Sequence, residues 1–147
     1  MRQPKYQLKA GKKLHVFQFV SEGPKGTISK IIEFTETNLS GFYNLSFGDK
    51  DNETGKMNYK VITNNGDSEK NLATVVSAIY AFTDKYPDVM VYATGSTRAR
   101  TRFYRMGINK YLNEVNKDFY VYGEIDENWH EYHKDISYEG FAVKRKK

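Results

Sequence analysis

The 147-residue sequence contains no cysteine, and it has only three prolines and one tryptophan. The absence of cysteine excludes a disulfide framework, a cysteine-ligated zinc or iron–sulfur site and a cysteine nucleophile. The sequence has no run of about 18 apolar residues, so we expect no membrane-spanning helix. Its basic start leads directly into strand-like sequence, so we also expect no signal peptide. These absences favour a cytoplasmic protein.

Aromatic residues are abundant, because 12 tyrosines and 9 phenylalanines bring the aromatic share to 15%. Hydrophobic residues make up 39% and charged residues 28% of the chain, which is enough apolar material for a folded core. The length predicts a single domain over residues 1–147. The basic segments at residues 1–13 and 144–147 could be flexible ends.

The net charge of +5 is distributed in blocks along the chain. Residues 1–20 carry five basic side chains and no acidic one, and residues 96–117 carry six basic side chains against Glu114. Residues 118–139 reverse the sign, and residues 144–147 are all basic. Three basic blocks that meet in space would form a surface for a polyanion, whereas solvated helix faces and tails would only keep the protein soluble.

The hydrophobic pattern changes its period near residue 66. Alternating apolar and aromatic residues predict strands at 14–20, 27–37, 41–48 and 58–63. Spacings of three and four then predict helices at 67–86 and 96–116. An apolar run at 89–93, typical of a strand covered on both faces, separates these helices, and another strand is predicted at 119–123. We expect a loop or short helix at 125–135, and either a last strand or an irregular tail at 137–144.

This order predicts an α+β fold with one mixed sheet. An N-terminal antiparallel meander is followed by a βαβαβ part with two long helices, whose strands we expect to be parallel with right-handed crossovers. The order resembles the ribonuclease-H-like arrangement of three antiparallel strands followed by alternating helices and strands. That resemblance concerns topology, and a fold does not imply a function.

The candidate site is the junction between the strand at 89–93 and the second helix. The unpaired N–H groups of a helix N-terminus attract anions, and Gly95 would let a phosphate approach the backbone. Hydroxyl groups of Thr94, Ser96 and Thr97 could donate hydrogen bonds to that phosphate. In the alternative reading, these hydroxyl groups are ordinary helix caps.

Four arginines follow this junction and divide by helical angle. Arg98, Arg102 and Arg105 lie within roughly 60° of one another and form an exposed cationic stripe. Arg100 points toward the side of Tyr104 and Tyr111, where it could reach over the sheet edge and hold a phosphate with two hydrogen bonds. Otherwise Arg100 would pair with a carboxylate such as Asp67 or Glu69.

The segment from Asn64-Asn65-Gly66-Asp67 through Tyr86-Pro87 to Gly95-Ser96-Thr97, with Arg98, Arg102 and Tyr104, resembles an uncharacterised family of small bacterial proteins. The resemblance covers most of the chain after about Tyr43. It implies a bacterial, intracellular protein that carries a domain of unknown function. It supplies no activity and no catalytic residue.

Three weaker patterns carry little functional weight. His130 and His133 lack a third ligand at fixed spacing, so we predict that they bind no metal, and we expect no cofactor. The carboxylates that ribonuclease-H chemistry needs are poorly matched, because the strand before Gly95 ends in Thr94. The loop at residues 49–55 lacks the last glutamate of a calcium loop.

The residues favour a nucleic-acid-interacting protein, with RNA or another polyanion as its partner. Phosphates would bind at the Gly95–Arg105 junction and the basic termini, and Tyr43, Tyr92 or Tyr104 could stack on bases. Its enzymatic version is a metal-independent ribonuclease of the bacterial toxin kind. One rival is a module whose basic second helix binds an acidic protein partner or antitoxin. The other is a binder of a small phosphorylated ligand at Gly95–Arg100. Whether the protein is an enzyme, and its oligomeric state, stay open.

Overall fold

The computed structural model describes residues 5–11, 15–58, 63–94 and 98–146. Within these residues the chain forms nine strands and two helices. Its α+β class and its single mixed sheet agree with the prediction. Neither of the two helices is long and apolar enough to cross a membrane.

The chain divides into two compact units. The first unit comprises Met1–Thr35 and Ser46–Lys85, and the second comprises Glu36–Leu45 and Tyr86–Lys147. In sheet order the strands run β1-β2-β3-β4-β6-β9-β7-β8, and β5 pairs with β4 outside this path. Strand β4 contributes its first residues to the second unit and its last residues to the first.

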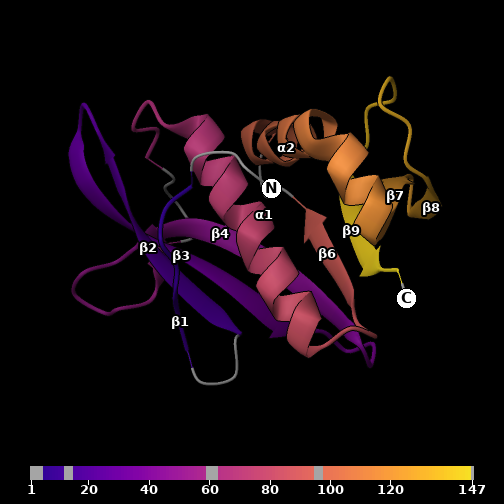
Figure 1. The fold of residues 1–147 in the computed structure, drawn as a ribbon, viewed down its shortest axis with the longest axis horizontal. Coiled ribbons are helices and arrows are strands. Elements are labelled where there is room, and N and C mark those ends of the chain that lie inside the picture. Colours follow the sequence, from indigo (N-terminus) through magenta and orange to yellow (C-terminus); the bar gives the residue numbers. More distant parts are fainter. Residues whose placement is uncertain (1–4, 12–14, 59–62, 95–97, 147) are drawn as a thin grey trace. The chain divides into compact units, whose positions relative to one another are not determined.

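The first unit contains the antiparallel meander and the first helix. Its elements are β1 (Lys9–Ala10), β2 (Val16–Gly23), β3 (Gly26–Glu36), the end of β4 (Phe42–Lys50), β5 (Met57–Asn58) and α1 (Ser68–Lys85). Strands β2 and β3 pair antiparallel from Val16 to Gly23, across a turn at residues 24–25. Phe82 of α1 stacks on Phe34 of β3 with the ring centroids 4.1 Å apart, so α1 covers this face of the unit (Figure 1).

The second unit contains the start of β4, β6 (Met90–Thr94), α2 (Arg98–Asp118), β7 (Phe119–Ile125), β8 (Asn128–Glu131) and β9 (Gly140–Arg145). Helix α2 contacts β6, β7 and β9. Val91, Val121 and Val143 occupy adjacent positions on these three strands and are all buried. They therefore form the core beneath α2.

Both predicted helices are confirmed, and the strand between them lies inside the sheet, as predicted. Strand β6 pairs with β4 on one side and β9 on the other. The expectation that both of its faces are covered was wrong for one face. Val91 and Ala93 are buried, whereas Met90, Tyr92 and Thr94 are only half-buried, because the face opposite α2 carries no helix within the second unit.

The C-terminal strands differ from the prediction in their direction and order. Strand β4, predicted as part of the antiparallel meander, pairs in parallel with β6, and β9 pairs antiparallel with both β6 and β7. The predicted contiguous parallel arrangement is therefore interrupted. Of the two alternatives for residues 137–144, the last strand is confirmed: Gly140–Arg145 form β9 in the interior of the sheet, so Lys144 and Arg145 are part of the sheet.

Two other strand predictions need correction. The segment at 125–135, expected to be a loop or short helix, contains β8, which pairs with β7 through a two-residue turn at Asp126-Glu127. Of the strand predicted at 58–63, the structure places Asn58 in β5 and Thr63 outside any strand, and residues 59–62 lie outside the described residues.

Candidate functional site

The predicted phosphate junction is only partly described by the structure. Gly95, Ser96 and Thr97 lie outside the described residues. Thr94 ends β6, and its hydroxyl group hydrogen-bonds to Tyr92. In α2, Arg98 and Arg102 are exposed, as the predicted stripe requires.

The other two arginines, Arg100 and Arg105, are half-buried and interact with the side chains of Tyr104 and Ser137. Arg105 was predicted to be part of the exposed stripe but is half-buried, and it donates a hydrogen bond from Nη1 to the hydroxyl oxygen of Ser137 at 3.1 Å. Arg100 is half-buried on the side of Tyr104, where its positive charge works to lower the pKa of that tyrosine. Burial has the larger effect and raises the pKa of Tyr104 to about 12. Arg100 thus faces a different environment from the exposed stripe.

The three tyrosines predicted to stack on bases do not lie together. Tyr104 lies on the buried side of α2 and is only 8% exposed, so its ring is not available to a base. Tyr43 pairs with Val91, whose side chain belongs to the buried face of the sheet. Tyr92 projects from the opposite face and is half-buried. Of the three, only Tyr92 belongs to the open face of the second unit.

This open face carries a group of aromatic side chains that strand register brings together. Residues directly opposite each other in paired strands project from the same face. One row across the strands contains Asn44, Tyr92, Ala142, Tyr122 and Glu131, and the row beside it contains Phe42, Met90, Lys144 and Tyr120. A third row contains Thr94, Gly140, Glu124 and Trp129.

A hollow of about 230 Å³ lies in the middle of these rows. It is lined by Phe42, Met90, Tyr122, Trp129 and Ala142. Ala142 forms its floor, since this small side chain lies between the larger rings of Tyr92 and Tyr122 on the neighbouring strands. The walls are aromatic and apolar, so the hollow suits a flat ring more than a charged group.

The aromatic rings around the hollow contact one another. Trp129 meets Tyr92 edge to face with the centroids 5.3 Å apart, and Phe42 lies 5.7 Å from Tyr92. Trp129 is nevertheless 39% exposed and Tyr120 is 52% exposed. Large aromatic side chains that stay exposed on a sheet are typical of surfaces that bind a partner by stacking. We call this set of residues the aromatic face: Phe42, Met90, Tyr92, Tyr120, Tyr122, Trp129 and Ala142.

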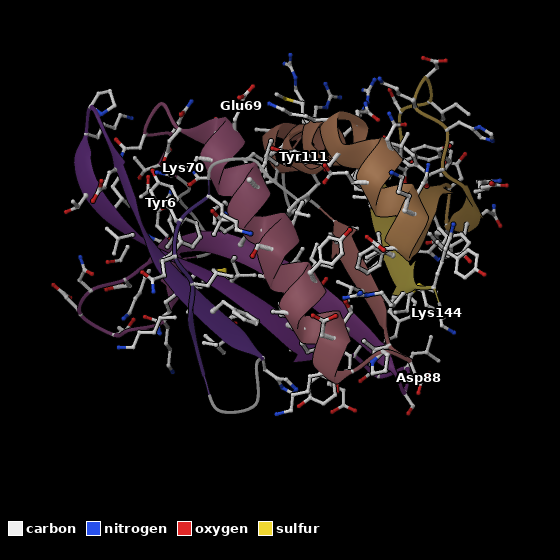
Figure 2. The ribbon with its side chains drawn as sticks, viewed as in Figure 1. Tyr6, Glu69, Lys70, Asp88, Tyr111 and Lys144 are labelled. Carbon is white, nitrogen blue, oxygen red and sulfur yellow. The ribbon has the colours of Figure 1, made fainter. Side chains whose placement is uncertain are left out.

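Opposite charges flank the aromatic face at its two ends. At one end lies Lys144, labelled in Figure 2 near the end of β9. Beside it, Lys146 places its ammonium group 5.2 Å from the ring centre of Tyr120. At the other end, the Tyr92 hydroxyl group donates a hydrogen bond to Oε1 of Glu124 at 3.2 Å. Burial, followed by the negative charge of Glu124, raises the pKa of Tyr92, so this hydroxyl group keeps its proton at neutral pH.

The remaining candidates have structural explanations or lack the geometry for chemistry. His130 and His133 are exposed, and among the described residues no three His, Asp or Glu side chains gather closely enough to hold a metal ion. Asp49, in the loop that faintly resembles a calcium site, instead binds the buried Lys30 and accepts hydrogen bonds from the backbone N–H and hydroxyl group of Thr63.

The sequence analysis missed most of the aromatic face, although β7 carried a usable signal. The alternation in Phe119–Ile125 places Phe119 and Val121 on the buried side and Tyr120 and Tyr122 on the other. A strand with bulky aromatic residues on its outward side indicates a binding surface. The contribution of Ala142 had no comparable signal, because it depends on β9 lying between β6 and β7.

Comparisons with known proteins give a family but no activity. The profile of one family, described as a family of unknown function (DUF6934), matches residues 2–146. No curated protein and no solved structure matches the chain. The resemblance to ribonuclease-H-like folds is therefore unconfirmed.

Proposed function

The chain belongs to the DUF6934 family, whose function is unknown, and we propose from its own residues that it binds single-stranded RNA through the aromatic face. The observation that carries the proposal is the hollow over Ala142, surrounded by partly exposed aromatic rings on the face of the second unit opposite α2. Aromatic side chains on a sheet bind unpaired bases by stacking, and RNA offers such bases in its loops and ends.

The charges next to the aromatic face support a nucleic acid over an apolar partner. Lys144 and Lys146 lie at the same end of the face as Tyr120. A base that stacks near Tyr120 would therefore have its phosphate within reach of two ammonium groups. The net charge of +5 would add a general attraction for a polyanion.

Binding can be followed through Trp129, because it is the only tryptophan in the chain and belongs to the aromatic face. We expect short single-stranded RNA to change its fluorescence. The Tyr120→Ala variant should bind RNA about 5- to 100-fold more weakly, since one stacked base contributes about 1–3 kcal/mol. Losing one phosphate contact in Lys144→Ala should lower the slope of log affinity against log salt by about 0.7.

Arg102→Ala is the matched control, because it removes an exposed cation of the second unit from α2 rather than from the sheet. Its affinity for RNA should fall by less than about threefold. If Arg102→Ala weakens binding more than Tyr120→Ala does, the cationic stripe is the RNA-binding surface and the proposal fails. A gel assay on the same samples tests whether bound RNA is cleaved, as a ribonuclease of the toxin kind would require.

A further inference from the structure

We propose that the hollow over Ala142 selects guanine among the four bases, and that the Glu124 carboxylate recognises this base by accepting hydrogen bonds from its edge. This inference rests on the proposed function and adds to it the identity of the base. It starts from the position of Glu124, which shares the open face with the hollow but lies one row away from its floor.

The surroundings of Glu124 hold its carboxylate beside the aromatic rings. Its Oε1 accepts the hydrogen bond from Tyr92, whose ring contacts Trp129 edge to face. Oε1 also lies over the backbone of Gly140, where a Cβ atom would come within 3.1 Å of it. Glycine at this position therefore leaves room for the carboxylate, which shares its row with Trp129, one of the residues that line the hollow.

The carboxylate keeps acceptor capacity after binding Tyr92. An ionised carboxylate has two oxygens and about four acceptor positions. The hydrogen bond from Tyr92 uses one of them. A base that enters the hollow from the lysine end would turn its far edge toward the remaining positions.

The chemistry of the base edges then favours guanine. Guanine presents two adjacent donors, N1–H and the N2 amino group, and both can point at one carboxylate. Adenine and cytosine present an amino group beside an unprotonated ring nitrogen, whose lone pair would face the negative charge. Uracil presents one N–H between two carbonyl oxygens. Only guanine can therefore donate two parallel hydrogen bonds without opposing a lone pair to Glu124.

The spacing of charges along β9 suits one nucleotide. Gly140, beside Glu124, and Lys144 lie four residues apart on β9, which corresponds to about 13 Å along a strand. Ala142 lies midway between them. A guanosine nucleotide can thus place its ring over Ala142, its phosphate near Lys144 and its donor edge toward Glu124.

The test uses nonamer RNAs in which eight uridines surround one central base that is guanine, adenine, cytosine or uracil. Affinities are measured by Trp129 fluorescence with the full chain. We expect the guanine nonamer to bind about tenfold more tightly than the uracil nonamer, as one base read by two hydrogen bonds allows. Glu124→Gln should reduce this ratio below about threefold while the affinity for the uracil nonamer is kept or raised.

Glu127→Gln is the matched control, since it removes the same charge from the exposed turn of the same hairpin. It should keep the guanine preference, and circular dichroism checks that both variants are folded. Equal binding of all four nonamers by the parent, or a preference that survives Glu124→Gln, would overturn the guanine inference and leave RNA binding standing. If the parent binds none of the nonamers, both the inference and the proposed function are wrong.

Discussion

Lys30 is a fully buried cation in the first unit, with a side-chain exposure of 0%. Its ammonium group binds the Asp49 carboxylate and donates a hydrogen bond to the backbone oxygen of Thr63 at 2.8 Å. Asp49 in turn accepts two hydrogen bonds from Thr63. The charge of Lys30 is therefore compensated by these neighbouring protein groups, because water does not reach its side chain.

We predict that Asp49→Asn lowers the free energy of unfolding by about 3–5 kcal/mol, because it leaves the buried ammonium group without a counter-charge. Urea denaturation followed by circular dichroism measures this change. Glu53→Gln removes an exposed carboxylate from the neighbouring turn and should change stability by less than about 0.5 kcal/mol. A loss below about 1 kcal/mol for Asp49→Asn would contradict the prediction.

The β7–β8 hairpin is an element whose turn residues do not match its geometry. Strands β7 and β8 are joined by Asp126 and Glu127, with φ angles of 51° and 66°. A two-residue turn with both φ angles positive is strongly favoured by Asn-Gly, whereas a glutamate in the left-handed region is strained. This turn therefore costs the hairpin stability, and β8 contributes Trp129 to the aromatic face.

Replacing both residues, Asp126→Asn with Glu127→Gly, should stabilise the protein by about 0.5–1 kcal/mol. The substitutions relieve the backbone strain of the folded state. Glycine also raises the conformational entropy of the unfolded chain, which offsets part of this stabilisation. Differential scanning calorimetry should then give a higher melting temperature. As a control, Glu127→Gly alone should give part of this increase, and a lower melting temperature for the double variant would refute the proposed strain.

The same hairpin explains part of the difference between sequence-based expectation and structure. Helices α1 and α2 were predictable because their apolar spacing repeats locally along the chain. Strand β8 was not, since Asp126-Glu127 carries none of the glycine or asparagine that signals a tight turn. The interior position of β9 was not predictable either, because alternation shows which residues share a face but not which strands are neighbours.

In the candidate site, too, features that depend on local sequence were predictable and features that depend on strand pairing were not. Local patterns predicted the exposure of Arg98 and Arg102 and identified Tyr92 as a residue of interest. The hollow depends on the register of β4, β6, β7, β8 and β9, and the pairings of β6 with β4 and with β9 join segments that lie far apart in the sequence. Reading the apolar run at 89–93 as covered on both faces also concealed the open side of β6, where Tyr92 lies.

At the scale of the whole molecule, two buried tyrosines make the free energy of unfolding depend on pH in the alkaline range. Burial raises the pKa of Tyr104 to about 12, against a smaller opposing effect of Arg100. Burial likewise raises the pKa of Tyr132 to about 12, opposed by Arg105 and reinforced by Tyr138. In the unfolded chain both tyrosines would ionise near pH 10. Between these values the folded protein holds protons that the unfolded chain has lost.

The free energy of unfolding should therefore be insensitive to these two groups below pH 10 and should fall as the pH rises from 10 toward 12. Urea unfolding at a series of pH values measures the slope. Tyr104→Phe and Tyr132→Phe should each make the slope shallower, whereas Tyr120→Phe, which removes an exposed hydroxyl group, should not. Equal slopes in all three variants would show that burial of Tyr104 and Tyr132 does not govern the alkaline transition.

The position of β9 determines when during protein synthesis the aromatic face can form. Strand β9 follows both of its partners along the chain, yet it lies between them. Until residues 140–145 have left the ribosome, β6 and β7 have no strand between them, and the hollow has no Ala142 beneath it. Synthesis of β9 therefore completes the sheet of the second unit and the aromatic face at the same time. The RNA-binding surface proposed above cannot exist on a nascent chain before this strand has been made.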